Sequence, residues 1–454
     1  MRALAAAVAA VVAGVAGFAP PVAAQQRTAV PARLTLADAI VIARERNPEY
    51  LQAVNSYRAQ GAQVRAGWGA FMPSLTLRMS TSGYDQRTVT GQDTVGRPIR
   101  IDPAVTFQQS SSNQSLSAGI TLFDGFSNLH SLRAARANQD AADAARWATR
   151  SRVDAETTRR FYEALRTSQL IALEERLLAS AREQRDNTDR LFRAAAANQE
   201  DLLGAEADVA NAELQLARAT GDADKAVLSL REELGLSEPV TLEVVGELPP
   251  AWDPTALSAD SLVALALTDH PQIERLAQAA DAAHLRATST RGARWPTVQL
   301  GASLSRSIGL QSYQALFDLN PKNRTLSFSM SVDLPLFTGF QTSARVAAAD
   351  ADARNADESL RAGQLALEGD VRAAVIDVQN AYQALRLAER GSALSSERLR
   401  LARERYAIGA ISFANLQILI DRASQDERQL TNARYAFAEA VVALEERAGR
   451  PVRP

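Results

Sequence analysis

The sequence "LFDGF" at residues 122–126 returns as "LFTGF" at residues 336–340, which is 214 residues further along the chain (336 − 122). In each copy a glycine, Gly125 or Gly339, precedes the second phenylalanine. Glycine adopts backbone conformations that are closed to other residues, so each copy is expected to permit a sharp turn of the chain. A repeat of this length indicates a duplicated half of a domain rather than a short solenoid unit.

Three further pairs of segments support the duplication. They are "RNPEY" at 46–50 with "DHPQI" at 269–273, Pro73 with Pro296, and "REELG" at 231–235 with "EERAG" at 445–449. The first two pairs share an offset of 223 residues (296 − 73) and the last has an offset of 214 (449 − 235), so a loop is shorter in the second copy. We therefore divide the mature chain into a first repeat over 25–240 and a second repeat over 241–454.

Residues 1–24 are predicted to be a secretory signal peptide. Arg2 is followed by a long run of alanine and valine, and the small residues that end the run suit cleavage after Ala24. An N-terminal membrane anchor is the alternative interpretation of the same run. After removal of a signal peptide, the mature chain would act outside the cytoplasm.

The composition excludes several kinds of site. The chain has no cysteine, which rules out disulfides and cysteine-based metal sites, and its three histidines lie far apart in the sequence. We expect no metal and no cofactor. The net charge is −2 without a basic block, which argues against binding to nucleic acid. After the leader, no apolar run reaches the roughly 18 residues that a transmembrane helix needs.

Each repeat contains two segments in which apolar and small polar residues alternate, a pattern with the period of a β-strand. The predicted strands lie at about 74–84, 114–124, 297–305 and 325–336. Polar loops are expected between them, at about 85–113 and 306–324. The apolar face of these strands suits lipid and the polar face suits water, although an amphipathic hairpin on a soluble helical body would give the same alternation.

A long helical hairpin is predicted after each strand pair, over 127–234 in the first repeat and 340–448 in the second. Residues 127–193 contain neither proline nor glycine, and a helix of this length would span roughly 100 Å. Seams of alanine, valine and leucine at heptad spacing indicate coiled-coil packing. The fold class is therefore mainly α, with a transmembrane β part.

Four strands are too few to close a pore, and an open sheet edge in lipid leaves unpaired backbone groups. We therefore expect the chain to associate with copies of itself. Three copies would supply 12 strands (3 × 4) for a β-barrel and antiparallel helical hairpins for an α-barrel. The residues alone leave the number of copies open.

In the order of these elements, the chain resembles the TolC-type outer-membrane efflux and secretion channels. The resemblance rests on the signal peptide, "LTLADAI" with a following "NP", the strand pairs, "LF(D/T)GF" and the long hairpins. It implies a homotrimer in outer-membrane lipid that extends into the periplasm and docks an inner-membrane pump of RND or ABC type through a periplasmic adaptor. The protein would be the passive exit duct of a tripartite efflux pump or a type I secretion system. Drugs, metal ions and secreted proteins remain open as cargo.

The resemblance also assigns residues to the junctions between strands and helices. Pro73 and Pro296 would mark the crossings from helix to strand, and Gly125 and Gly339 the return crossings. Aromatic residues flank the return crossings, and they suit either the membrane interface or the top of the helical core. These residues are Phe123, Phe126, Phe337 and Phe340.

A gate is expected at the periplasmic tips of the hairpins. There the family has a motif of the form Y-x-x-G-x-x-x-x-x-D, which Tyr406 and Gly409 match in the second tip and Asp201 matches in the first. The chain departs from the pattern further along. Ile411 stands where an arginine tether is expected, and Asn415 and Ile418 stand where constricting acids are expected. Asp421, one helical turn later, is the candidate replacement, and the alternative is that it is an ordinary solvated charge.

Two other classes of protein compete with the channel. A periplasmic structural or adaptor protein with coiled coils would explain the helices but not the four alternating strands. An exported enzyme would need a nucleophile with a base or a set of ligands at suitable spacing, and none stands out. We therefore expect no catalytic residues and no enzymatic activity.

Overall fold

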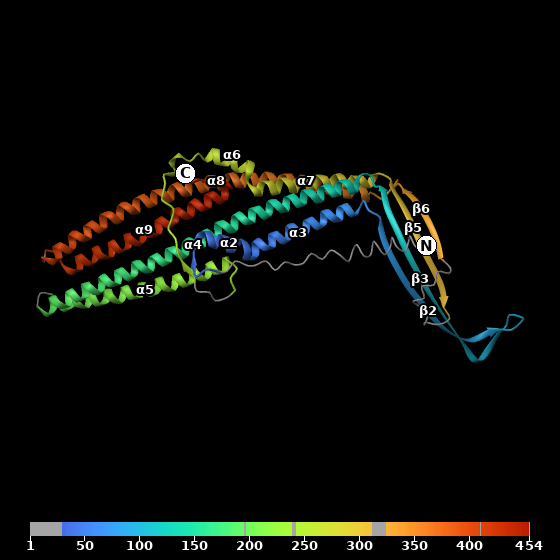
Figure 1. Ribbon diagram of the computed structural model, residues 1–454, viewed down its shortest axis with the longest axis horizontal. Coiled ribbons are helices and arrows are strands. Elements are labelled where there is room, and N and C mark those ends of the chain that lie inside the picture. Colours follow the sequence, from blue (N-terminus) through green and yellow to red (C-terminus); the bar gives the residue numbers. More distant parts are fainter. Residues whose placement is uncertain (1–29, 195–196, 238–241, 311–323, 409, 454) are drawn as a thin grey trace.

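The computed structural model describes residues 30–453 except 195–196, 238–241, 311–323 and 409. The predicted signal peptide and Gly409 therefore lie outside the described residues. The molecule is elongated, with long helices along most of its length and a sheet at one end (Figure 1). Among the described residues, none of the helices combines the length and the apolar character that crossing a membrane requires.

The same succession of elements occurs in both halves of the chain. The first half contains β1 (Arg33–Leu34), α2 (Leu36–Arg46), α3 (Pro48–Gly69), β2 (Ser74–Gln92), β3 (Pro98–Phe123), α4 (Ser127–Arg193) and α5 (Gln199–Glu233). The second half contains β4 (Glu243–Val244), η1 (Pro254–Ala256), α6 (Ala259–Asp269), α7 (Pro271–Arg291), η2 (Gly292–Arg294), β5 (Thr297–Leu310), β6 (Arg324–Asp333), α8 (Gln341–Ala407) and α9 (Phe413–Ala448).

Local sequence explains where the shorter helices begin and break. Thr35 and Asp38 form a capping box at the start of α2. Proline fixes φ and lacks a backbone donor, so it is tolerated only in the first turn of a helix. Pro48 and Pro271 each occupy such a position, at the start of α3 and α7. The prolines thus end α2 and α6 and allow the chain to restart in a new direction.

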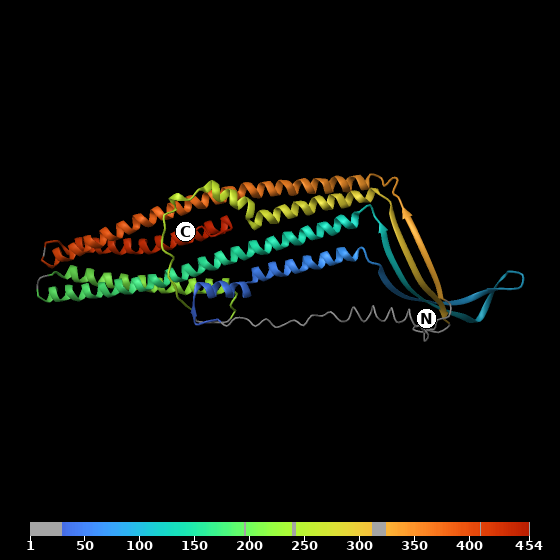
Figure 2. The ribbon, with the colours of Figure 1, turned by 45° about the horizontal axis from the view of Figure 1, so that its top comes forward.

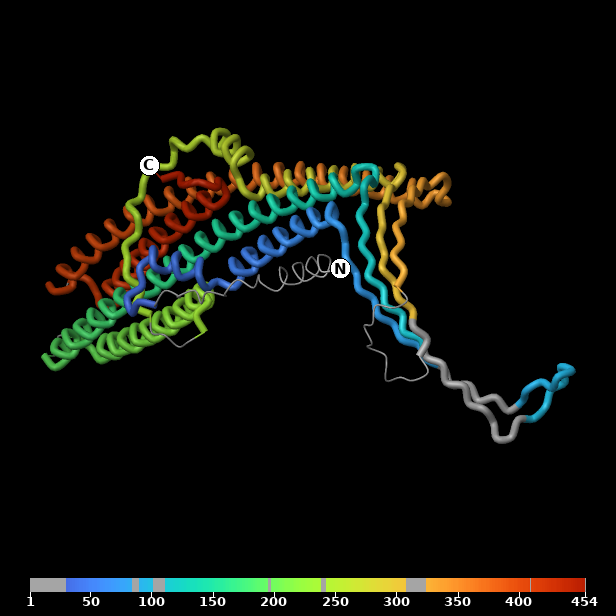
Figure 3. The backbone as a smooth tube through the Cα atoms, turned by 45° about the vertical axis from the view of Figure 1, so that its right-hand side comes forward, coloured from blue at the N-terminus to red at the C-terminus, as the bar shows by residue number. Residues whose placement is uncertain are grey.

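The sheet has the order β2-β3-β5-β6, and all three pairings are antiparallel. Its register places apolar residues opposite one another: Leu116 of β3 faces Leu77 of β2 and Leu304 of β5. The four strands leave the ends of the long helices at a sharp angle (Figure 3). Many apolar side chains of the sheet are exposed in the single chain, including Leu326 (62%), Phe328 (75%) and Met330 (68%) of β6.

The strands of the first repeat are longer than predicted, and a polar loop over 85–113 was the wrong expectation. β2 continues to Gln92 and β3 begins at Pro98, with a turn between them in which Asp93 accepts hydrogen bonds from the backbone of Val95 and Arg97. The apolar alternation fades after the first ten residues. Backbone pairing needs no such alternation, so the ladder runs on where the pattern stops.

The strands of the second repeat also differ from the predicted limits. β5 runs to Leu310, beyond the predicted end at about 305. β6 ends at Asp333 rather than about 336, because Pro335 cannot donate to a strand ladder. Most of the predicted loop at 306–324 lies outside the described residues.

The helical body consists of two hairpins, α4 with α5 and α8 with α9, and the two shorter helices α3 and α7 lie alongside α4 and α8 toward the sheet (Figures 1 and 2). One buried cluster centres on Phe161 and Tyr162 of α4 and includes Tyr435 of α9. A second cluster includes Val378 of α8 and Leu444 of α9. Because α4 and α9 share the first cluster, the two hairpins are joined near the middle of the molecule.

Candidate gate at the helical tips and junctions with the sheet

The first repeated phrase forms the turn from β3 into α4. Phe123 ends β3, and Gly125 and Phe126 both have a left-handed backbone, with φ of +67° and +63°. A Cβ on residue 125 would lie 2.5 Å from the carbonyl oxygen of Gly292 and 2.7 Å from Cβ of Trp295. Glycine is therefore required here both for the backbone conformation and for the close approach of η2, which belongs to the second half of the chain.

The second phrase repeats the turn in a more open setting. Gly339 and Phe340 have φ of +59° and +65°, but no atom lies within 4 Å of the place where a Cβ on Gly339 would stand. The aromatic rings of both phrases pair edge to face, at 5.4 Å for Phe123 and Phe126 and at 5.7 Å for Phe337 and Phe340. Three of the four rings, all but Phe123, are mostly exposed in the single chain.

The two prolines assigned to the opposite crossings lie between helix and strand. Pro73 follows the end of α3 and directly precedes Ser74, where β2 begins. Pro296 lies between η2 and Thr297, where β5 begins. Since proline disfavours helical backbone at the residue before it, each proline separates the helix from the extended strand.

At the tip of the first hairpin, Asp201 takes part in the helix cap. Its backbone N–H donates to Oδ1 of Asn198 at 2.7 Å, and its carboxylate accepts from the backbone of Asn198 at 3.4 Å. In the second tip Asn415 stands at the equivalent place, and its backbone N–H donates to Oγ of Ser412 at 3.4 Å. Both tips therefore begin their return helices with a side-chain cap.

Tyr406 brings the two tips together. The pKa of its phenol is raised, mainly because the phenol is partly buried. The negative charge of Asp201 raises this pKa further, whereas the side chain of Thr188 lowers it. Its ring also lies 6.1 Å from the ring of Phe413. Tyr406 of α8 is thus in reach of α4, α5 and α9, at a cavity of about 950 Å³ that Asp201 and Ile411 also line.

An apolar contact joins the two hairpins near Ile411, where the resemblance predicts an arginine tether. Phe413 and Leu416 of α9 are 7% and 0% exposed. A Cβ on Gly204 of α5 would lie only 3.2 Å from the ring of Phe413, so the small glycine makes room for the ring. Ile411 therefore stands beside a hydrophobic contact between the hairpins rather than beside an ionic one.

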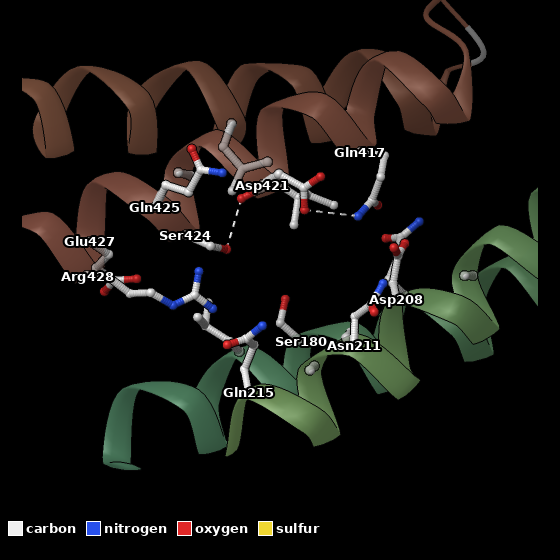
Figure 4. Close-up of a pocket in the computed structure, with 18 of the residues that line it drawn as sticks. Ser180, Asp208, Asn211, Gln215, Gln417, Asp421, Ser424, Gln425, Glu427 and Arg428 are labelled. Carbon is white, nitrogen blue, oxygen red and sulfur yellow. Dashed lines mark hydrogen bonds between the residues drawn. The ribbon is translucent and has the colours of Figure 1, made fainter. Parts of the chain in front are cut away.

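Asp421 lies in a second cavity, of about 400 Å³, between the two hairpins and opposite Asp208 of α5 (Figure 4). Gln417 donates to its carboxylate at 3.3 Å. Burial, and then the negative charge of Asp421, raise the pKa of Asp208 to about 6. Sequence reasoning missed Asp208, because nothing in a helix rich in acids distinguishes a carboxylate that faces another helix.

A second contact that sequence reasoning missed lies on the same interface. Glu174 of α4 is 5% exposed and accepts two hydrogen bonds from Arg428 of α9. Arg428 also lines the cavity of Asp208 and Asp421. The two residues are 254 positions apart, so no local pattern could pair them.

The described residues offer no group of three or more histidine, aspartate or glutamate side chains placed to hold a metal ion. The chemistry available at the tips is therefore hydrogen bonding, ion pairing and apolar contact. Such contacts can hold two helical hairpins together or release them.

The fold is that of an outer-membrane channel protein. The structure aligns with that of the outer membrane channel CmeC of Campylobacter jejuni with a TM-score of 0.74 and 16% sequence identity. The alignment spans 91% of this chain and 85% of the CmeC chain. A likeness at this identity concerns the fold alone.

The chain belongs to the outer membrane efflux protein family, whose model matches residues 39–236 and 262–450. It is 28% identical to the protein CyaE of Bordetella pertussis over 77% of this chain and 70% of CyaE. It is 30% identical to the outer membrane efflux protein BepC of Brucella suis over 74% of this chain and 66% of BepC. The protein is therefore a duct of the outer membrane for efflux or secretion, in a family of channels rather than enzymes, and the adaptor alternative is not supported.

Proposed function

We propose that the chain forms a passive exit duct that is held shut at its helical tips. The observation that carries this proposal is the position of Tyr406, which lines one cavity with Asp201 of the other hairpin and lies near enough for the charge of Asp201 to raise its pKa. A gate needs interactions that are strong enough to hold and weak enough to exchange. Polar side chains around a cavity of about 950 Å³ meet that need better than a fully packed apolar core.

The sheet supports assembly with copies of the same chain. Within the described residues, β2 and β6 each pair with one neighbour only, so both edges of the sheet are open. In lipid, each backbone group without a hydrogen bond at an open sheet edge costs several kcal/mol of free energy. A closed barrel has no such edge. Three chains joined edge to edge would close a 12-stranded barrel, and we propose a homotrimer.

Exposed apolar side chains on the long helices also support assembly with copies of the same chain. α8 exposes an apolar stripe made of Leu365, Ile376, Leu387, Leu394 and Leu401, each between 42% and 73% exposed. α5 exposes Leu203, Leu214 and Leu228 at 57%, 47% and 58%. Aligned stripes of this kind on long helices are coiled-coil seams without a partner. A neighbouring copy would cover them and close the helices into a tube.

Membership of the outer membrane efflux protein family supports a role within complexes for efflux or secretion. We propose that the tips, at the end of the molecule far from the sheet, meet a periplasmic adaptor and an inner-membrane pump of RND or ABC type. Among the described residues, no group of three or more histidine, aspartate or glutamate side chains is placed to hold a metal ion as cargo, and the energy for transport would come from the pump.

Single-channel conductance in planar bilayers tests the gate. Tyr406→Phe removes only the hydroxyl, and Asp201→Ala removes the carboxylate. Both variants should increase the current above that of the unmodified channel. Glu200→Ala is the matched control, because Glu200 is the adjacent, exposed carboxylate and should leave the current unchanged.

Two results would contradict parts of the proposal separately. Currents that neither variant changes would keep the channel and move the gate away from Tyr406. The absence of any current from protein that stays dispersed without detergent would reject the membrane pore itself.

A further inference from the structure

Each repeat contains a joint at which a short helix ends, a proline begins the next helix, and the chain touches the end of the return helix. In the first repeat Asn47 makes this joint, which we call the first clasp. Its side-chain oxygen accepts from the backbone of Glu49 at 2.9 Å and of Tyr50 at 3.2 Å. Its amide nitrogen donates to the backbone carbonyl of Glu233, at the end of α5, at 2.8 Å.

In the second repeat His270 stands in the place of Asn47 and makes the second clasp. Its Nδ1 accepts from the backbone N–H of Gln272 at 3.1 Å, which caps α7. Its ring lies beside the end of α9, where it lines one cavity with Glu446, and the backbone of Glu446 raises the pKa of the ring. The two clasps therefore hold equivalent helix ends together with different side chains.

The return helices end in the same way at both clasps. Gly235 and Gly449 have φ of +66° and +69°, and the backbone N–H groups beyond each helix bond back to its last turn. A Cβ on Gly235 would lie 2.4 Å from the carbonyl oxygen of Arg46, and one on Gly449 would lie 3.2 Å from Cδ2 of His270. The close approach of glycine leaves little room to rearrange either joint.

The difference between the two side chains is chemical. An asparagine amide has the same hydrogen-bonding groups at every pH near neutrality. Asn47 also donates to Oε1 of Glu233 at 2.9 Å, and a carboxyl oxygen can still accept this bond when the carboxyl is protonated. A neutral imidazole accepts at one nitrogen and donates at the other, whereas a protonated imidazole only donates. A proton on Nδ1 of His270 would face the backbone N–H of Gln272, at a helix N-terminus that already carries a partial positive charge.

We propose that the second clasp is a pH-sensitive joint, which opens when His270 is protonated, and that the first clasp is its pH-insensitive counterpart. Opening would free the C-terminal end of α9 from the start of α7 and leave the first repeat unchanged. This inference goes beyond the channel function and rests only on the contacts of the two clasps.

The surroundings of His270 favour the neutral ring. Burial lowers its pKa from the ordinary value of 6.5, and the backbone and charge of Glu446 oppose that shift only in part. Glu446 is itself paired with Arg159 of α4 at 2.9 Å. Arg152 of α4 and Arg275 of α7 line the cavity beside His270 and Glu446. Asp269 of α6 directly precedes His270 in the chain. Because the folded pKa lies below the unfolded one, the clasp is intact above 6.5 and is lost as the pH falls.

Hydrogen–deuterium exchange of the full-length protein in detergent, at pH 7.5 and 5.5, tests the proposal. After correction for the intrinsic pH dependence of exchange, peptides over 270–275 and 445–452 should lose about tenfold in protection at pH 5.5. Peptides over 46–51 and 231–237, from the first clasp, should not lose protection and so provide an internal control. Burial raises the pKa of the Glu233 carboxyl, so its protonation at lower pH favours the folded state rather than opening the clasp.

His270→Asn, which installs the residue of the first clasp, should abolish the response. His284→Asn is the control for loss of a histidine, because the His284 side chain is exposed and, among the described contacts, bonds only Asp357. This variant should respond like the unmodified protein. An equal response of both clasps in the unmodified protein would overturn the proposal without any variant. A response that persists in a folded His270→Asn protein would overturn it as well.

Discussion

Glu174 of α4 and Arg428 of α9 form a two-pronged ion pair across the interface of the two helical hairpins, with nitrogen–oxygen distances of 2.5 and 2.8 Å. The Glu174 carboxylate is almost fully buried. Arg428 also lines the cavity that Asp208 and Asp421 line. Planar, paired hydrogen bonds of this kind fix orientation as well as distance. The pair therefore sets how α4 and α9 lie against each other on the side of the tips.

Breaking this pair should destabilise the contact between the hairpins. Arg428→Ala would leave the Glu174 carboxylate buried and unpaired, at a cost on the order of 3 kcal/mol. Thermal unfolding of the purified protein should show a lower midpoint. Arg176→Ala is the control: its pair with Glu427 is exposed, so its loss should cost less than about 1 kcal/mol. Equal effects of the two variants would contradict a special role for the buried pair.

Asp208 should make the contact between α5 and α9 weaker at neutral pH than at mildly acidic pH. Its folded pKa of about 6 lies above the ordinary 3.8, so its contribution to stability is present below 3.8 and is lost as the pH rises through 6. Asp208→Asn removes the repulsion from Asp421 and should stabilise the protein at pH 7 by about 1 kcal/mol, after allowance for solvent screening.

The measurement is the difference in unfolding midpoint between Asp208→Asn and the unmodified protein, from pH 5 to pH 8. The difference should grow with pH and level off above the pKa of Asp208. Taking a difference at each pH cancels the titration of His270, which acts in the opposite direction in the same range. A difference that is constant with pH would show that burial and the charge of Asp421 do not raise the pKa of Asp208.

Gly125→Ala and Gly339→Ala should differ, although both residues have the same left-handed backbone. Alanine at 339 meets open space, and only the backbone strain of about 1–2 kcal/mol remains. Alanine at 125 would also collide with Gly292 and Trp295, so it should cost several kcal/mol or prevent folding. The yield and the unfolding midpoint of the two variants give the comparison, and a Gly339→Ala protein as damaged as Gly125→Ala would contradict it.

The apolar stripe of α8 should be covered in the assembled protein. Leu394 is 73% exposed in the single chain, so Leu394→Glu should place a charge in the interface between copies and lower the fraction of trimer. Ser396→Glu adds the same charge two residues away on an exposed part of α8 and should be tolerated. Mass measurement in detergent reports the number of chains, and a full trimer with Leu394→Glu would exclude the stripe from the interface.

Sequence patterns predicted the elements whose signals are local. The recurrence of "LFDGF" as "LFTGF" marked two equivalent turns, and the structure gives both a left-handed glycine. The repeated segments "RNPEY" and "DHPQI" also proved equivalent, because Pro48 and Pro271 within them begin α3 and α7. The family assigned from the order of these elements is confirmed. Each of these features depends on a few neighbouring residues, so the chain itself is sufficient to show it.

The contacts between distant elements could not be read in this way. The partner of Glu174 lies 254 positions away, and Asp208 looks like any other acid of a polar helix. The long hairpin of β2 and β3 was missed because its outer part is held by backbone pairing rather than by an apolar face. The roles of Asp201, Tyr406, Asn415 and Asp421 in a gate stay predictions.

The amino-acid sequence by itself determined the repeat, the order of helices and strands, and the turns where they change, because backbone propensity and apolar periodicity are local properties. Tertiary structure alone decided which faces meet. It placed Arg428 on Glu174 and Asp421 opposite Asp208, and it set His270 against Gly449 at the end of α9. Packing of long helices selects their relative height and rotation collectively, so no single segment of sequence carries that information.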